Sequence, residues 1–431
     1  MRPIRQILSS TCSSQSKQAL GYRWASLCLL VSLNGIHAYA NDGGLGLRAD
    51  GILESLFAAG NAETSWLDQG TGKFRQGADN RDPITRLGLA VSYRSSLQSQ
   101  FRLDIAYHSD AQPRIGVTQA YWQFKPIATE HFRTRYRVGA FHLPSSFENH
   151  DLLWSSPYSI TPSVVNTWVG EEFRAIGAEG RWQWQPSAYS PHQISLTAAA
   201  FAANDSAGAM LAWRGWTAHD RQTFLGERID FAPIPIIADG QPFDQQAAEF
   251  EPFVEVDDRI GYYLALDWRY RSNLRIRHFY YDNRGDPLVV KNGQYAWDTK
   301  FHQTAFRYNL SRSLVFTSQY LFGTTAMGPG LVDLEFASGF ALLSKQFSAH
   351  RISLRTEFFR VDDVDLLPIL DPNDEQGDRL TLGYGYRNPN QWALDLEFSR
   401  IQSDRDHREI FRRPTNIVEN KFTARIRYRF D

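Results

Sequence analysis

The feature that most constrains this chain is a regular alternation of apolar and polar side chains, which recurs in sixteen successive segments. The last segment, 421–430, alternates without interruption. Successive side chains of a β-strand point to opposite faces, so this segment forms a strand with one apolar face. Such a strand fits a soluble sheet that buries the apolar face, or a transmembrane barrel that turns it to lipid. The apolar positions are Phe422, Ala424, Ile426, Tyr428 and Phe430, and the positions between them are Lys421, Thr423, Arg425, Arg427 and Arg429.

The connections between the segments separate these two folds. Short turns alternate with long connections, and the long ones include 58–81, 143–172, 204–258, 362–377 and 402–419. An even strand number with short turns at one end and long loops at the other is typical of bacterial transmembrane barrels, whereas a soluble sandwich gives no reason for it. Each segment has about ten residues, the length that a tilted strand needs to cross a bilayer. We therefore predict an all-β chain that forms a sixteen-stranded antiparallel transmembrane β-barrel.

Two segments are ambiguous at this stage. In 296–309 the phase of the strand is not fixed, because Trp297 and Phe301 fall on one face while Phe306 and Tyr308 fall on the other. The stretch 209–216 also has a strand-like pattern, but counting it would make the strand number odd. We assign it to the long connection 204–258, as a hairpin or an element that plugs the barrel.

The beginning of the chain indicates export. Residues 1–23 carry basic but no acidic side chains, residues 24–36 form an apolar run, and Ala38 and Ala40 provide small residues for cleavage. These are the parts of a secretory signal peptide, so we predict a signal at 1–40 and a single barrel over 41–431. Both cysteines, Cys12 and Cys28, lie in the signal, which leaves the mature chain without disulfides or thiolate metal sites.

Basic residues outnumber acidic ones on the polar faces of the predicted strands, although the whole chain has a formal net charge of −1. Cations around a narrow aqueous passage attract anions, so these residues predict a lumen that prefers anions. The alternative is that the arginines pair with acids across strands and only solvate the wall. The overall charge gives no reason to expect a nucleic-acid partner. The residues expected to line the passage are Arg133, Arg135, Arg137, Arg275, Arg277, Arg355, Arg425, Arg427 and Arg429.

The chain resembles the porins of Gram-negative bacteria, and within them the phosphate-selective porins O and P. The resemblance rests on the aromatic Phe430 near the end of the last strand, and on the arginine ladders of 133–137 and 425–429. It implies a passive diffusion channel for small hydrophilic solutes, anions above all, in the outer membrane of a Gram-negative bacterium. It also implies a homotrimer in contact with outer-membrane lipid and lipopolysaccharide.

The resemblance further gives a role to the connection 143–172, which follows the fifth strand. A long loop at this position is similar to the inward-folded constriction loop of sixteen-stranded porins. Its acids would oppose an anion at the constriction. The residues expected to act there are Glu148, Asp151, Trp168, Glu171 and Glu172.

Three other functions remain open: a carbohydrate-preferring porin, suggested by aromatic residues in the long loops; a binding barrel plugged by 204–258; and an outer-membrane hydrolase. For a hydrolase, the neighbouring pairs His150-Asp151 and His219-Asp220 lack a third group to orient the base. The eleven histidines show no metal-ligand spacing. We therefore expect neither an enzyme nor a metal or other cofactor.

Overall fold

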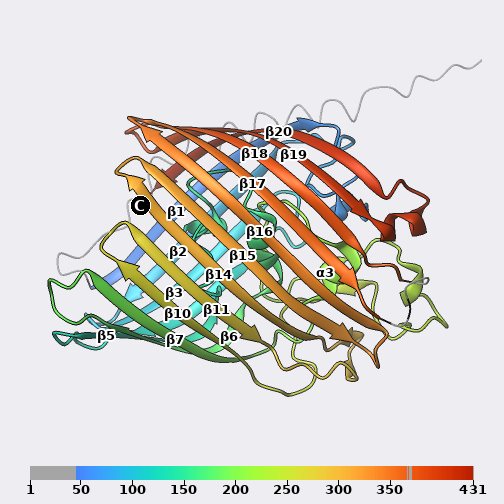
Figure 1. Ribbon diagram of the computed structural model, residues 1–431, viewed down its shortest axis with the longest axis horizontal. Helices are drawn as coiled ribbons and strands as arrows, with labels where there is room; N and C mark the ends of the chain where they lie inside the picture. The colour runs from blue at the N-terminus through green and yellow to red at the C-terminus, as the bar shows by residue number, and fades with distance from the viewer. Residues whose placement is uncertain (1–44, 366, 368–370, 431) are drawn as a thin grey trace, which may run out of the picture. The chain divides into compact units, whose positions relative to one another are not determined.

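A computed structural model describes residues 45–365, 367 and 371–430, so the predicted signal peptide lies outside the described residues. Sixteen antiparallel strands form one closed barrel, which confirms the predicted fold. Figure 1 shows the strands running obliquely around it. In chain order they are β1 (Gly46–Gly60), β2 (Ile84–Arg94), β3 (Ser99–His108), β4 (Ile115–Phe124), β5 (Phe132–Phe141), β6 (Ala175–Trp184), β7 (His192–Ala202), β10 (Gly261–Tyr270), β11 (Leu274–Asp282), β14 (Asp298–Ser311), β15 (Leu314–Met327), β16 (Val332–Phe347), β17 (His350–Asp363), β18 (Glu375–Arg387), β19 (Trp392–Arg405) and β20 (Asn416–Phe430).

The barrel closes where the first strand meets the last. β1 and β20 pair in antiparallel register from Gly51 opposite Phe430 to Gly60 opposite Lys421. Glycine is needed at position 51, because a Cβ there would lie 2.1 Å from the ring of Phe430. Since every strand has two neighbours, the sheet has no unpaired edge, as a barrel in lipid requires.

Alternate side chains of the strands form an apolar outer belt. Leu354, Leu382 and Phe398 point outward and are 42–50 % exposed, whereas the inward neighbours Arg355 and Thr381 are 1 % exposed. A closed barrel turns such a belt toward lipid. Further large apolar side chains of the belt are Leu264, Leu266, Tyr320, Ile352, Phe358, Leu380 and Phe422.

The strand β14 has apolar side chains on both faces. Phe301 points into the barrel and is fully buried, while Tyr308 points outward and is 37 % exposed. The alternation was ambiguous here because the inner face of β14 packs against apolar side chains in the lumen and the outer face belongs to the belt.

Short turns connect the strands at one end of the barrel, the turn end, and loops L1 to L8 connect them at the loop end. Two helices lie in the loops, α2 (Val164–Glu172) in L3 and α3 (Ala209–Arg214) in L4. The strand-like stretch 209–216 is thus mostly a helix, buried on all sides, within the loop to which the pattern assigned it. Among the described residues, no helix is long and apolar enough to cross a bilayer. The longer loops are L1 (61–83), L3 (142–174), L4 (203–260), L5 (283–297), L7 (364–374) and L8 (406–415).

Smaller elements complete the loops. They are η1 (Trp66–Asp68), η2 (Leu152–Trp154), η3 (Pro235–Ile237) and η4 (Asp406–Phe411), with the short hairpins β8 (Ile229–Asp230) to β9 (Glu249–Phe250) and β12 (Val290–Lys291) to β13 (Gln294–Tyr295).

Candidate functional site

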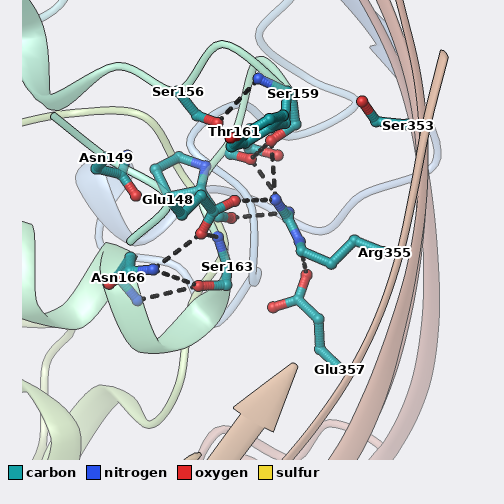
Figure 2. Close-up of polar contacts among 12 residues, drawn as sticks. Glu148, Asn149, Ser156, Ser159, Thr161, Ser163, Asn166, Ser353, Arg355 and Glu357 are labelled. Carbon is teal, nitrogen blue, oxygen red and sulfur yellow. Dashed lines mark hydrogen bonds and ion pairs between the residues drawn. The ribbon is translucent and has the colours of Figure 1, made fainter. Parts of the chain in front are cut away.

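An arginine of the barrel wall holds L3 inside the lumen. Arg355 on β17 donates to the carboxylates of Glu148 in L3 and of Glu357 on its own strand, the latter at 2.8 Å. It also donates to Ser159 Oγ at 2.8 Å and to the carbonyl of Pro162 at 3.0 Å. Figure 2 shows the guanidinium between the loop and the strand. Its side chain is 1 % exposed, so Arg355 anchors L3 instead of facing an open passage.

Charged side chains on the two strands that follow β17 extend this anchor. Glu397 on β19 accepts the N–H of Ile160 at 2.7 Å, and Glu357 accepts the N–H of Val164 at 2.7 Å. Val164 begins α2, and the unpaired N–H groups at a helix start attract an anion. Arg379 on β18 lies 3.3 Å from Glu357 and balances its charge. The strand pattern places these wall residues in the lumen, but the pattern gives no sign that they contact L3.

A cluster of apolar side chains packs in the loop-end half of the lumen. Trp168 of α2 is 2 % exposed, and its ring centroid lies 4.7 Å from Phe173, 5.5 Å from Trp216 and 5.1 Å from Phe336. We call this cluster, with the inward side chains of the strands around it, the lumen core. The side chains that α3 adds to the lumen core are Ala209, Met210, Leu211, Ala212 and Trp213.

A buried acid joins the two helices of the lumen. Glu171 of α2 accepts a hydrogen bond from Arg214 of α3 at 3.0 Å, and His219 of L4 lies 3.2 Å away. Burial alone would raise the pKa of Glu171, but the Arg214 guanidinium and His219 hold it below its usual range. Glu171 therefore carries a compensated charge and does not repel anions.

The neighbouring acid, Glu172, makes no ion pair with a described residue. Its Oε2 accepts the N–H of Gly208 at 2.6 Å, and its Oε1 has no hydrogen-bond partner among the described residues. Burial raises the pKa of Glu172 to about 8. The carboxyl is therefore protonated in the folded barrel at neutral pH, where the same group in an unfolded chain is ionised.

We expect the free energy of unfolding to fall as the pH rises from 4.5 to about 8, the unfolded and folded pKa of Glu172. In this window the folded state holds a proton that the unfolded state has released, so raising the pH favours unfolding. Denaturant unfolding in detergent at a series of pH values measures the effect. Glu172→Gln keeps an oxygen for Gly208 and should flatten this part of the profile. An unchanged slope in the variant would assign the pH dependence to another group.

Two of the arginines predicted to line the passage on β5 share one acid. Arg137 binds Glu179 through Nε at 2.9 Å and Nη2 at 2.7 Å, and Arg135 reaches the same carboxylate at 3.1 Å. Arg133, nearer the turn end, is exposed and makes no ion pair with any described residue. One acid thus compensates one of the two charges that surround it.

The predicted arginines of β11 and β20 are paired in the same way. Arg275 and Arg277 both bind Asp267, at 2.5 and 2.7 Å. Arg425 binds Asp395 at 2.8 Å, and its side chain is 1 % exposed. The cationic positions of the wall are therefore largely engaged in ion pairs, as the alternative interpretation of the sequence allowed. Arg427 of β20 binds Glu54 at 2.7 Å.

A polar cavity of about 240 Å³ lies between β3–β5 and L3. We call it the side chamber. At its rim, Arg429 of β20 donates to Asp151 of L3. The residues around it include Arg102, Gln119, Tyr121 and Arg137 of the wall, His142, His150, Asp151 and Trp154 of L3, and Gln222 of L4.

The neighbours His219 and Asp220, considered for a hydrolase, have different partners in the structure, whereas His150 and Asp151 both line the side chamber. His219 contacts Glu171, whereas Asp220 binds Arg75 and Arg86 at 3.0 and 2.9 Å. In L4, carboxylate oxygens of Asp205, Glu255 and Asp257 lie within 4.8 Å of one another. Backbone amides already bind Asp205, and an acidic cluster by itself does not define a metal site.

No protein-family model matches the chain, and no curated protein is similar to it in sequence. Solved structures do match. The outer membrane channel DcaP of Acinetobacter baumannii is 9 % identical, with a TM-score of 0.54 over 92 % of this chain and 100 % of that chain. OmpT of Vibrio cholerae is 8 % identical, with a TM-score of 0.51 over 91 % and 100 %. The chain has the fold of outer-membrane porins. OprB of Pseudomonas putida is 12 % identical, with a TM-score of 0.50 over 89 % and 94 %.

The fold and the outer belt together give the location. A closed antiparallel barrel that exposes large apolar side chains around its outside is stable only where lipid covers them. Sixteen antiparallel strands, short turns at one end and a porin-like fold are typical of barrels in the bacterial outer membrane. The protein is therefore an outer-membrane β-barrel of a Gram-negative bacterium.

Proposed function

We propose that this protein is a passive outer-membrane channel for small hydrophilic solutes, narrowed by both L3 and L4. The observation that carries the proposal is the side chamber, a polar space beside the inward-folded L3 of a porin-like barrel. Glu148, Trp168, Glu171 and Glu172 act in this proposal by fixing L3 across the lumen, and Asp151 by facing the chamber.

In this proposal, the residues that give the channel its preference for anions lie at the turn end of the barrel. Arg133, Arg181, Arg307 and Arg351 point into the lumen near the strand ends that join the short turns, and none of them makes an ion pair with a described residue. Unpaired cations around a mouth raise the local concentration of anions. Selectivity for phosphate, which the likeness to phosphate-selective porins suggests, is a narrower form of this proposal. A preference for carbohydrates is the alternative to a preference for anions.

Contacts outside the lumen also belong to the proposal. The apolar belt supports contact with outer-membrane lipid, and lipopolysaccharide covers the outer leaflet in which the loop end would lie. The proposal includes a homotrimer by analogy with porins, and cross-linking in native membranes tests it.

Single-channel recording in planar bilayers tests the channel function, and a reversal potential in a salt gradient tests its preference. Replacing Arg133, Arg135 and Arg137 together by glutamine should shift the reversal potential toward cations. The variant removes three positive charges and leaves Glu179 with an uncompensated negative charge in the passage. Arg228→Gln is the control, because Arg228 is 60 % exposed in L4. An equal shift in both variants would contradict a role for β5 in selectivity.

A plugged binding barrel is the second candidate, and the lumen core favours it. The core places a packed apolar cluster in the loop-end half of the lumen, and water and ions do not readily enter such a cluster. Absence of conducting steps in the native protein would favour this candidate over the channel.

A further inference from the structure

Two guanidinium groups present unused donors to the side chamber. Arg102 on β3 binds Asp104 through Nε at 2.7 Å and Nη2 at 3.1 Å. Arg137 on β5 binds Glu179 through the same two nitrogens. Each acid thus occupies one edge of its guanidinium, and no ion pair among the described residues uses Nη1 of either arginine. Hydrogen bonds from a charged donor to a carboxylate are among the strongest in proteins.

A carboxylate faces the same chamber from L3. Asp151 uses its Oδ1 to cap Leu152 at 2.9 Å and to bind Arg429. Among the described residues, its Oδ2 makes no hydrogen bond. The neighbouring His150 does not compete as a cation, since burial, and then Arg307, lower its pKa. Burial and Arg174 likewise keep the pKa of His142 well below its usual value. The L3 side of the chamber therefore offers an acceptor, and the wall side offers donors.

Each charged side chain that lines the chamber has an oppositely charged partner. Arg102 is paired with Asp104, Arg137 with Glu179, and Asp151 with Arg429. A solute with a net charge would add an uncompensated charge between protein walls, where charges are solvated less well than in bulk water. A solute that carries one positive and one negative group would add none.

The size and the apolar parts of the chamber set further limits. Its volume of about 240 Å³ suits a small solute. The ring of Trp154 stacks on His142 at a centroid distance of 4.5 Å and forms part of the lining, as does the ring of Tyr121. These faces can contact a short side chain while the charged ends bind the polar groups.

We propose that the side chamber binds small zwitterions of the α-amino acid type. The carboxylate of the solute accepts hydrogen bonds from Nη1 of Arg102 and Arg137, and its ammonium group donates to Oδ2 of Asp151. The site deepens the proposed function, because it names the solute class that would pause in the channel, but binding to it does not require that the barrel conducts.

Titration calorimetry on the full-length protein in detergent tests the site. Glycine and serine are the zwitterions, and acetate and methylamine are probes that carry only one of the two charges. We expect the zwitterions to bind at least about tenfold more tightly than either probe, the value of one charge-assisted hydrogen bond. Equal binding of acetate and glycine would indicate a simple anion site and overturn the proposal, as would the absence of heat with every probe.

Variants separate the site from the fold. Arg102→Gln and Asp151→Asn should each weaken glycine binding about tenfold, while Arg114→Gln, an exposed cation just before β4, should leave it unchanged. Heat-induced mobility shifts on gels report whether each variant is still a folded barrel. Glycine binding without conducting steps would contradict the channel function but support the site. Conduction without glycine binding would contradict the site but support the channel function.

Discussion

Arg355→Leu is expected to release L3 from the wall and to lower the free energy of unfolding by about 3–5 kcal/mol, the cost of leaving buried charges without a partner. Glu148 and Glu357 are 0 and 3 % exposed. In this variant Glu148 loses its ion-pair partner, and Glu357 keeps, among the described residues, only the ion pair with Arg379 at 3.3 Å. Denaturant unfolding followed by tryptophan fluorescence measures the stability. Protease cleavage within 142–174 and increased noise in single-channel currents report the release of the loop.

Arg360→Gln is the matched control. Arg360 lies on the same strand and pairs with Asp362, but their side chains are 59 and 38 % exposed. Exposed ion pairs contribute about 1 kcal/mol or less, so this variant should behave like the native protein. Equal losses of stability in the two variants would mean that the anchor around Arg355 does not hold L3.

Replacing Met210, Leu211 and Trp213 of α3 by serine is expected to expel the helix from the lumen and to raise the channel conductance severalfold. The three side chains are 0–3 % exposed in the lumen core, and removing each costs about 2–5 kcal/mol of packing. The barrel wall should persist, because its strands are held by their own backbone hydrogen bonds. A sixteen-stranded barrel with an emptied lumen leaves an aqueous channel.

Leu288→Ser is the control for this experiment, since Leu288 is an apolar residue of L5 that is 65 % exposed. It should change neither the conductance nor the stability. If the α3 variant folds and its conductance equals that of the native protein, then solutes do not pass through the space that α3 occupies.

The strands could be predicted from sequence because one face of each meets lipid and the other does not. The alternation of apolar and polar side chains did not fix the phase of β14, because Phe301 packs in the lumen core and Tyr308 belongs to the belt. It also misread 209–216, because α3 is buried all around and a helix without a polar face has no helical period. The alternation is expected only where the inner side chains face water. At β14 and at α3 these side chains pack against other protein side chains instead.

The contacts within the lumen could be predicted only where they are local. Arg355 and Glu357 lie two residues apart on one face of a strand, which indicates a pair. Glu148, the third member of the cluster, is 207 residues away from Arg355 in the chain, and nothing in the alternation joins them. The surplus of cations on the wall was visible in the sequence, but the acids that neutralise them were not assigned to particular partners.

The seam between β1 and β20 has a consequence for how the protein is made. Glu54 on β1 binds Arg86 on β2 and Arg427 on β20, so one buried carboxylate ties the beginning of the cylinder to its end. The ring closes only when the fifteen residues of β20 arrive. Until then L3 and L4 would face the bilayer through an open side. In a chain truncated before β20, the apolar side chains of the lumen core would contact the hydrocarbon of the membrane. The closing strand therefore completes the wall that separates two apolar phases, the packed interior and the membrane.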